Sequence, residues 1–130
     1  MKHCILVVED NQLNRELLRD WLEAESYEVW CAADLKASYE VFSKRLLDIV
    51  LLDINLGKDD GLDLLAWMRQ KRETREIPVI AVTAHALVAE QQRILNAGCR
   101  ACLSKPIDFQ VLRVELNRWL PDSKTARIDS

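Results

Sequence analysis

The chain has 130 residues, 49% of them hydrophobic, which fits one domain with a single buried core and leaves no room for a second catalytic or DNA-binding domain. Its 18 basic and 21 acidic side chains give a net charge of −3, so it lacks the basic surface that unaided nucleic-acid binding needs. The longest apolar runs have the length of strands, too short for a membrane helix or a signal peptide, and we expect a soluble, cytoplasmic protein without membrane insertion.

The first half of the chain predicts three strands and two helices. Residues 4–8 form an apolar strand, and Asn11 caps a helix whose apolar stripe is expected to contain Leu13, Leu17, Leu18, Trp21 and Leu22. A second strand is predicted over 27–32, and Asp34 begins a helix whose buried face is expected to include Tyr39, Phe42 and Leu46. Residues 49–53 are typical of a central strand covered on both faces, and a loop is expected over 54–60.

The second half continues the alternation. Gly61 opens a helix with Leu62, Leu65, Trp67 and Met68, and a charged stretch leads to a strand over 78–82. A helix over 86–97 ends at Gly98, and a strand follows over 101–104. Asp108 caps a last helix that Pro121 ends, with an apolar face of Phe109, Leu112, Leu116 and Trp119.

Five strand-helix alternations predict an α/β fold with parallel strands and right-handed crossovers. Three of the strands end in charge, at Glu9 and Asp10, at Asp53 and at Lys105. Because the carboxyl ends of parallel strands share one edge, these side chains are expected to meet in one crevice, as in a magnesium-dependent phosphoryl-transfer site. Two carboxylates about 4 Å apart repel by roughly 4 kcal/mol at an effective dielectric constant of about 20, so a divalent cation is needed before a phosphoryl group can approach.

The four cysteines indicate no disulfide framework, because no secretory signal is present. Cys4 and Cys31 are expected to be small buried residues. Cys99 and Cys102 form a C-x-x-C, but no second half of a zinc site exists and the pair follows a helix C-terminus. No metal or redox role is therefore expected for it.

Five short motifs recur in a characteristic order: Val7-Val8-Glu9-Asp10-Asn11, Leu51-Leu52-Asp53-Ile54, Asp60-Gly61, Val82-Thr83-Ala84 and Lys105-Pro106. Together they resemble the receiver (response regulator) domain of bacterial two-component signalling, over residues 3–120. The likeness is greatest to stand-alone single-domain receivers and to those attached to hybrid kinases. It implies a flavodoxin-like (βα)5 fold, a doubly wound, five-stranded parallel sheet in the order 2-1-3-4-5. We expect a receiver domain over 1–121 and a polar, disordered tail over 122–130.

The resemblance also assigns roles to the strand-end residues. Asp53 is expected to be the phosphoacceptor, because a carboxylate at the end of a covered strand is both fixed and accessible. Glu9, Asp10 and Asp53 are expected to bind Mg²⁺ directly or through water, and the family pattern adds the backbone carbonyl of Asn55. Lys105 is expected to contact the transferring group as a point charge.

Further residues are expected to act as the switch. The Thr83 hydroxyl is expected to hydrogen-bond a phosphoryl oxygen, and the small Ala84 leaves the path open. The resemblance implies a cis bond before Pro106, and it places Asn55 and His85 beside the phosphoryl position, where they tune its lifetime.

Two positions depart from the family pattern. Cys102 stands where receivers usually carry a switch aromatic, so output is expected to rely on loop and helix shifts around residues 83–97. Gly57 stands where a proline is usual, which predicts a more flexible phosphorylation loop.

The function implied is a phosphorylation switch without an output domain. The phosphoryl donor is a sensor histidine kinase or a histidine phosphotransfer protein, and the signal passes by altered binding to a downstream protein. Such a domain is not a conventional enzyme, but it catalyses its own aspartyl phosphorylation and dephosphorylation. We expect a monomer or weak dimer with Trp119 in the core, and Met1 and the short tail favour a complete protein.

Three alternatives remain. A phosphorylation-independent, receiver-like adaptor would explain the missing aromatic, although the intact acidic and basic residues argue against it. A haloacid-dehalogenase-like phosphatase should carry its nucleophile after the first strand and a second Asp two residues later, where this chain has Asn55. A flavodoxin needs a phosphate-binding loop after the first strand, where Glu9 and Asp10 would repel phosphate.

Overall fold

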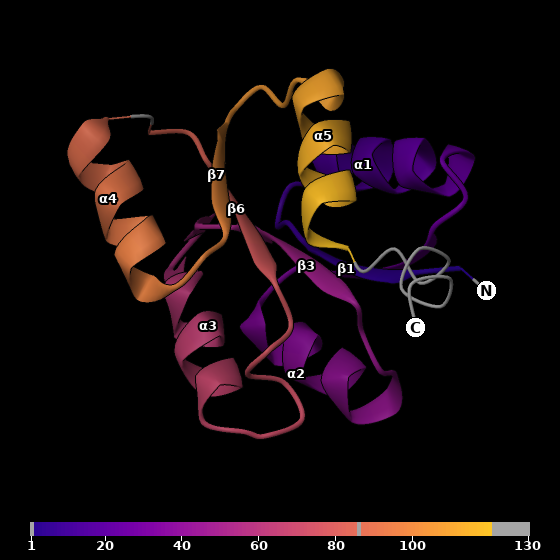
Figure 1. Cartoon of the computed structure of the whole chain (residues 1–130), viewed down its shortest axis with the longest axis horizontal. Helices are drawn as coiled ribbons and strands as arrows, with labels where there is room; N and C mark the ends of the chain where they lie inside the picture. Colours follow the sequence, from indigo (N-terminus) through magenta and orange to yellow (C-terminus); the bar gives the residue numbers. More distant parts are fainter. Residues whose placement is uncertain (1, 86, 121–130) are drawn as a thin grey trace, which may run out of the picture.

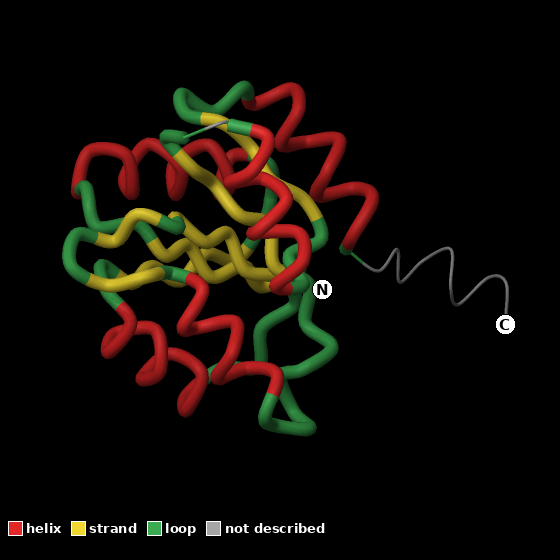
Figure 2. The backbone as a smooth tube through the Cα atoms, turned by 90° about the vertical axis from the view of Figure 1, so that its left-hand side faces the viewer, coloured by secondary structure: helices red, strands yellow, loops and turns green. Residues whose placement is uncertain are grey.

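The computed structural model describes residues 2–85 and 87–120, and these form one five-stranded parallel sheet with helices on both faces (Figures 1 and 2). The strands are β1 (Cys4–Val8), β2 (Glu28–Ala32), β3 (Ile49–Asp53), β6 (Val79–Thr83) and β7 (Ala101–Ser104). Their order is β2-β1-β3-β6-β7. Because β4 (Asn55–Leu56) and β5 (Asp59–Asp60) form a separate antiparallel hairpin, this is the predicted order 2-1-3-4-5, and the flavodoxin-like fold is confirmed.

Alternating side chains of the central strands supply two cores, one on each face of the sheet. Leu6, Val50 and Leu52 face α2 (Leu35–Lys44), α3 (Leu62–Arg69) and α4 (Val88–Ala97). Ile5 and Leu51 face α1 (Gln12–Ala24) and α5 (Phe109–Trp119). The strands β1, β3 and β6 are buried along their whole length, as expected of strands covered on both sides. The sheet is therefore a rigid support for whatever follows its carboxyl ends.

Side-chain caps and one glycine set the helix ends as predicted. The side chains of Asn11, Asp34 and Asp108 accept hydrogen bonds from the first turns of α1, α2 and α5. Gly98 ends α4 in the left-handed conformation at φ 111°. None of the helices among the described residues is long and apolar enough to cross a membrane.

Some expectations were wrong. Leu13 and Leu17 of α1 are exposed, because α1 covers the sheet along a stripe centred on Leu18 and Leu22. Leu46 is also exposed, because α2 ends at Lys44 and Leu46 lies beyond the helix. The expected loop over 54–60 contains the β4–β5 hairpin, whose two-residue strands are too short to leave a periodic pattern.

The last helix packs as expected. Leu112 and Leu116 are fully buried, and Phe109 stacks on Trp21 with ring centroids 4.9 Å apart. Trp119 is half-buried against the same core. Residue 86, the expected start of the fourth helix, lies outside the described residues, as do the stop at Pro121 and the tail over 122–130. Leu87 is described and has extended backbone, and α4 begins at Val88.

Candidate functional site

Three carboxyl groups meet at the carboxyl ends of β1 and β3. Glu9 and Asp10 directly follow β1, and Asp53 is the last residue of β3. The two strands pair in parallel, so their ends lie side by side, and the three carboxyl groups offer oxygen atoms within 4.8 Å of one another. Glu9 and Asp53 are only 3% and 2% exposed, whereas Asp10 is open to solvent. This pocket has buried acidic walls and an accessible mouth.

Lys105 supplies the positive charge in the pocket. Its Nζ lies 2.8 Å from Asp53 Oδ2 and 3.3 Å from Glu9 Oε1. The position is set by the backbone, because the Lys105 N–H donates to the Thr83 carbonyl of β6 over 2.9 Å. The peptide bond between Lys105 and Pro106 is cis. The structure thus brings Lys105 to Asp53 across 52 residues of sequence.

Burial and charge perturb the ionisation of two groups here. Burial raises the pKa of Glu9, the nearby Asp53 raises it further, and Lys105 opposes the rise. Burial alone would lower the pKa of Lys105, but its hydrogen bond to Asp53 and the charges of Asp53 and Glu9 outweigh burial and raise that pKa. The charge of Asp53 thus disfavours ionisation of Glu9, and the lysine is held as a cation.

These groups fit a magnesium ion. Mg²⁺ prefers hard oxygen ligands and usually takes one or two carboxylates together with water and phosphate oxygens. Glu9, Asp10 and Asp53 supply such oxygens in one cluster, with Asp10 at its exposed side. The role predicted for the Asn55 backbone carbonyl stays a prediction.

A hydrogen-bond network joins Asp53 to the end of β6. The Asn55 N–H donates to Asp53 Oδ1 over 2.9 Å. The Asn55 amide oxygen accepts from the buried Thr83 hydroxyl at 3.4 Å and from the Ala84 N–H at 3.3 Å. The His85 N–H donates to Thr83 Oγ1 over 3.0 Å. The Thr83 hydroxyl is therefore held within a loop network that begins at Asp53.

Two contacts at the site were not anticipated from the sequence. The first is the pair of hydrogen bonds that the Asn55 amide oxygen accepts from Thr83 and Ala84; Asn55 was expected beside the phosphoryl position, but not in contact with these two residues. The second is Arg15 of α1, whose Nη1 donates to the Glu9 carbonyl at 2.8 Å and to the Asp10 carbonyl at 3.4 Å. The sequence did offer a signal for this contact, because Arg15 lies in the first helical turn after the acidic end of a strand.

The two positions that depart from the family pattern, Gly57 and Cys102, differ in their local structure. Gly57 has φ 59°, a left-handed conformation that proline cannot adopt because its ring fixes φ near about −65°. Cys102 is half-buried on β7, against the core on the α4 side, and burial raises the pKa of its thiol. Burial also raises the pKa of the Cys99 thiol to about 12.

Comparison with known proteins gives consistent matches. Residues 5–117 match the response regulator receiver domain family. The polar-differentiation response regulator DivK of Brucella ovis is 36% identical over 123 residues, which is 95% of this chain and all of the relative. The receiver domain of the sensor histidine kinase PA1611 from Pseudomonas aeruginosa, solved with magnesium in its active site cleft, superposes with a TM-score of 0.82 at 31% identity over 92% of this chain and 98% of that one.

The fold alone is shared with a more distant structure. The chemotaxis response regulator CheY4 of Vibrio cholerae superposes with a TM-score of 0.85 at 23% identity, over 92% of this chain and all of the other.

Proposed function

The chain belongs to the response regulator receiver domain family, and on that premise we propose that Asp53 accepts a phosphoryl group from a phosphohistidine donor with the help of Mg²⁺. One observation carries the proposal: the nearly fully buried Asp53 carboxylate shares a cluster with Glu9 and Asp10 and contacts Lys105 at 2.8 Å. Because the chain belongs to this family, the alternatives of a phosphatase of the haloacid-dehalogenase type and of a flavodoxin are rejected.

The residues of the site have separate roles in the transfer of the phosphoryl group. An Asp53 carboxylate oxygen forms the new bond to phosphorus while the bond from phosphorus to the donor imidazole nitrogen breaks, and the imidazole leaves with a proton from solvent. Glu9, Asp10 and Asp53 would hold a Mg²⁺ ion, which would supply the charge that offsets repulsion between carboxylates and phosphoryl oxygens. Lys105 orients Asp53 before transfer and contacts the phosphoryl group after it.

The switch follows from the added charge. A phosphoryl group brings about −1.5 to −2 charge and strong acceptor oxygens. The Thr83 hydroxyl and the Ala84 N–H, which now share the neutral Asn55 amide oxygen at 3.3–3.4 Å, would turn to this stronger acceptor. We propose that the resulting loop shift alters the surface of α4, β7 and α5, which a downstream protein reads.

A groove beside the site suits the donor. It has a volume of about 350 Å³, lies next to Glu9 and Lys105, and is lined by apolar side chains including Leu17 and Phe109. Leu13, one turn from Leu17, is 75% exposed on the same helix. We propose that an apolar helix face of a sensor kinase or histidine phosphotransfer protein docks here, in the cytoplasm, and brings its phosphohistidine to Asp53.

The test is phosphorylation by acetyl phosphate with and without Mg²⁺, followed by intact mass. We expect one Mg²⁺-dependent phosphoryl adduct that Asp53→Ala abolishes and that the exposed control Asp20→Ala keeps. If Mg²⁺ binds and acetyl phosphate gives no adduct, a phosphorylated histidine donor is tried. Absence of an adduct from both donors would replace the proposal with the phosphorylation-independent adaptor, which the missing aromatic at Cys102 favours.

A further inference from the structure

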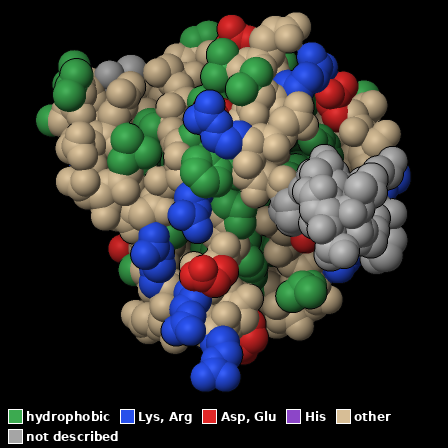
Figure 3. All heavy atoms as spheres, viewed as in Figure 1, with side chains coloured by type: hydrophobic (Ala, Val, Ile, Leu, Met, Phe, Trp, Pro, Cys, Tyr) green, Lys and Arg blue, Asp and Glu red, His purple; other side chains and the backbone are tan. Residues whose placement is uncertain are grey.

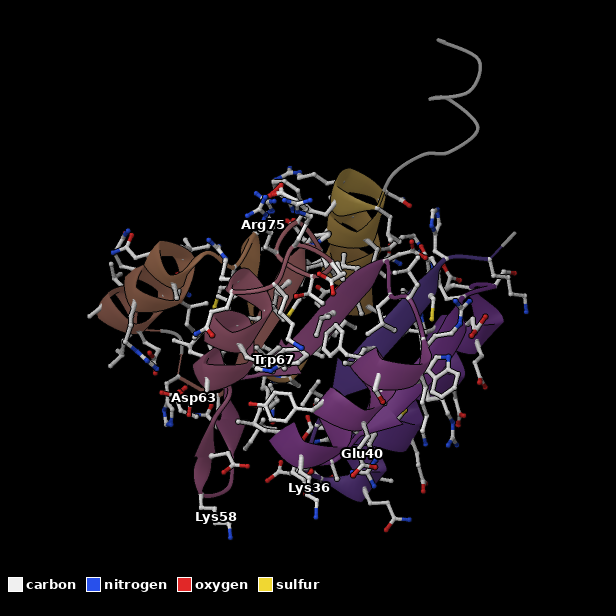
Figure 4. The ribbon with its side chains drawn as sticks, turned by 90° about the horizontal axis from the view of Figure 1, so that it is seen from below. Lys36, Glu40, Lys58, Asp63, Trp67 and Arg75 are labelled. Atoms are coloured by element: carbon white, nitrogen blue, oxygen red, sulfur yellow. The ribbon has the colours of Figure 1, made fainter. Side chains whose placement is uncertain are left out.

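A second groove lies on the α2 and α3 side of the sheet, at the end opposite to the acidic cluster. It has a volume of about 460 Å³ and runs between the end of α2 and the α3–β6 loop. Both segments lead into the first residues of strands, β3 and β6, whereas Asp53 is the last residue of β3. Figure 4 shows this separation, because the labelled Arg75 of the α3–β6 loop and Lys58 of the β4–β5 turn lie at opposite ends of the face. The phosphoryl-transfer chemistry does not use this groove.

Aromatic rings form the floor of the groove. Trp67 of α3 contacts two rings of α2, with centroids 4.8 Å from Tyr39 and 5.3 Å from Phe42, and the labelled Trp67 lies between the two ribbons in Figure 4. All three rings are half-buried, so each keeps surface that a partner can cover. Leu46, at the rim, is 75% exposed. Large rigid aromatic side chains in a pocket are typical of interface hot spots.

Hydrogen bonds hold the walls in place. The guanidinium of Arg45 binds both carboxylate oxygens of Glu28 at 2.8 and 3.0 Å. On the other wall, the Thr74 hydroxyl donates to the Met68 carbonyl at 2.6 Å and fixes the α3–β6 loop. A groove with fixed walls loses little conformational entropy when a partner binds.

The groove is basic, although the chain as a whole is acidic. Its charged lining consists of Lys44, Arg45 and Lys71 against Glu73 alone, while the net charge of the chain is −3. Glu28 balances Arg45, but among the described residues Lys44 has no acidic partner, and Lys71 lies over the Trp67 ring at 4.5 Å. Figure 3 shows several Lys and Arg side chains over α3 and the loop after it, with a few acidic side chains among them.

We propose that this groove binds an acidic peptide segment of a partner protein. A large apolar side chain of the segment would sit on the floor formed by Tyr39, Phe42 and Trp67, and its carboxylates would pair with Lys44 and Lys71. Two lysines around an aromatic floor suit a peptide better than a nucleic acid or a lipid surface, each of which needs a wider basic area. Because the groove lies at the other end of the sheet from Asp53, binding is independent of phosphorylation and leaves the donor face open.

The experiment is selection of random twelve-residue displayed peptides on the full chain, followed by titration of synthetic copies. We expect the enriched peptides to combine Asp or Glu with Trp, Phe or Leu. The double variant Leu46→Asp/Lys71→Glu should bind them at least about tenfold more weakly. A matched double variant, Leu87→Asp/Lys2→Glu, changes an equally exposed leucine and one lysine elsewhere, and it should bind within about twofold of the unmodified chain.

Asp53→Ala should bind the peptides with unchanged affinity, which separates this proposal from the proposed function. Peptides without acidic residues, failure to enrich any peptide, or equal binding to both double variants would each overturn the inference. The unmodified chain and the variants are also sedimented with anionic phospholipid vesicles. If the unmodified chain binds the vesicles and only the Leu46→Asp/Lys71→Glu variant does not, the groove binds a membrane surface, and the inference is overturned as well.

Discussion

Gly61 is the glycine whose replacement should disturb Asp53 most directly. It lies at the start of α3 with φ −56°, a conformation that alanine adopts readily. A Cβ atom at this position would lie 2.6 Å from the Asp53 carbonyl oxygen and 2.9 Å from Ile54 Cα. Both are backbone atoms, so no side chain can rotate away to make room.

The size of the effect can be worked out from these distances. Ordinary carbon-oxygen contacts begin at about 3.3 Å, so Gly61→Ala must move the Asp53 backbone by about 0.7 Å. Overpacking of this kind costs about 1–3 kcal/mol, and the reduced entropy of the unfolded chain returns about 0.4–1 kcal/mol. We expect a net loss of about 1–2 kcal/mol in the free energy of unfolding, and at least a tenfold slower phosphorylation, because misplacement of reacting groups by about 1 Å costs up to about a hundredfold.

Urea unfolding and the rate of adduct formation with acetyl phosphate measure the two effects. Gly98→Ala is the matched control, because Gly98 has φ 111° and the three atoms nearest to an added Cβ belong to the flexible guanidinium end of Arg69. Backbone strain should cost this control about 1–2 kcal/mol as well, with the phosphorylation rate unchanged. If Gly61→Ala is as stable as the unmodified chain and is phosphorylated at the same rate, contact with the Asp53 backbone is not what requires glycine there.

Three further predictions concern charge and thiol chemistry. Hydrogen bonds from Arg45 hold the pKa of Glu28 at about 2, below its usual 4.5, so its contribution to stability is complete above pH 4.5 and is lost as pH falls through 2. Glu28→Gln should therefore lose less stability than the unmodified chain between these pH values in urea titrations, and parallel curves would contradict this. Lys105→Ala removes a cation that competes for Asp53, so Mg²⁺ should bind several-fold more tightly by calorimetry while adduct formation falls at least about tenfold; weaker Mg²⁺ binding would refute the competition. Cys99, with a pKa of about 12, should resist iodoacetamide at pH 8 until the chain unfolds, and rapid labelling of the native protein would show that it is more accessible than its burial indicates.

The features that the sequence predicted well depend on neighbours along the chain. The buried strands appear as unbroken apolar runs, and the caps Asn11, Asp34 and Asp108 act on residues within three positions. The exposure of Leu13 and Leu17 was missed because the spacing of apolar residues shows which face of a helix is apolar, but not how much of that face the sheet covers.

The parts of the site that were missed depend on distant contacts. The Asn55 amide oxygen reaches Thr83 and Ala84 across 28 and 29 residues, and a local pattern carries no trace of such a pairing. The charged residues at the strand ends could be predicted from the local sequence, because charge that directly follows a buried apolar run must lie where the strand ends, at the carboxyl edge of the sheet.

The hydrogen bonds of Asp53 limit how a phosphoryl group can act on this fold. Both carboxylate oxygens are in use, Oδ1 by the Asn55 N–H and Oδ2 by Lys105. A phosphoryl group on either oxygen must therefore displace one of these contacts, and both lead to the loops after β6 and β7. A receiver with an aromatic switch turns such a displacement into the movement of a ring, which the half-buried Cys102 is too small to do. Under the proposed function, the signal must then travel through the backbone from Thr83 to α4, and substitutions at Asn55 should change output more than substitutions at Cys102.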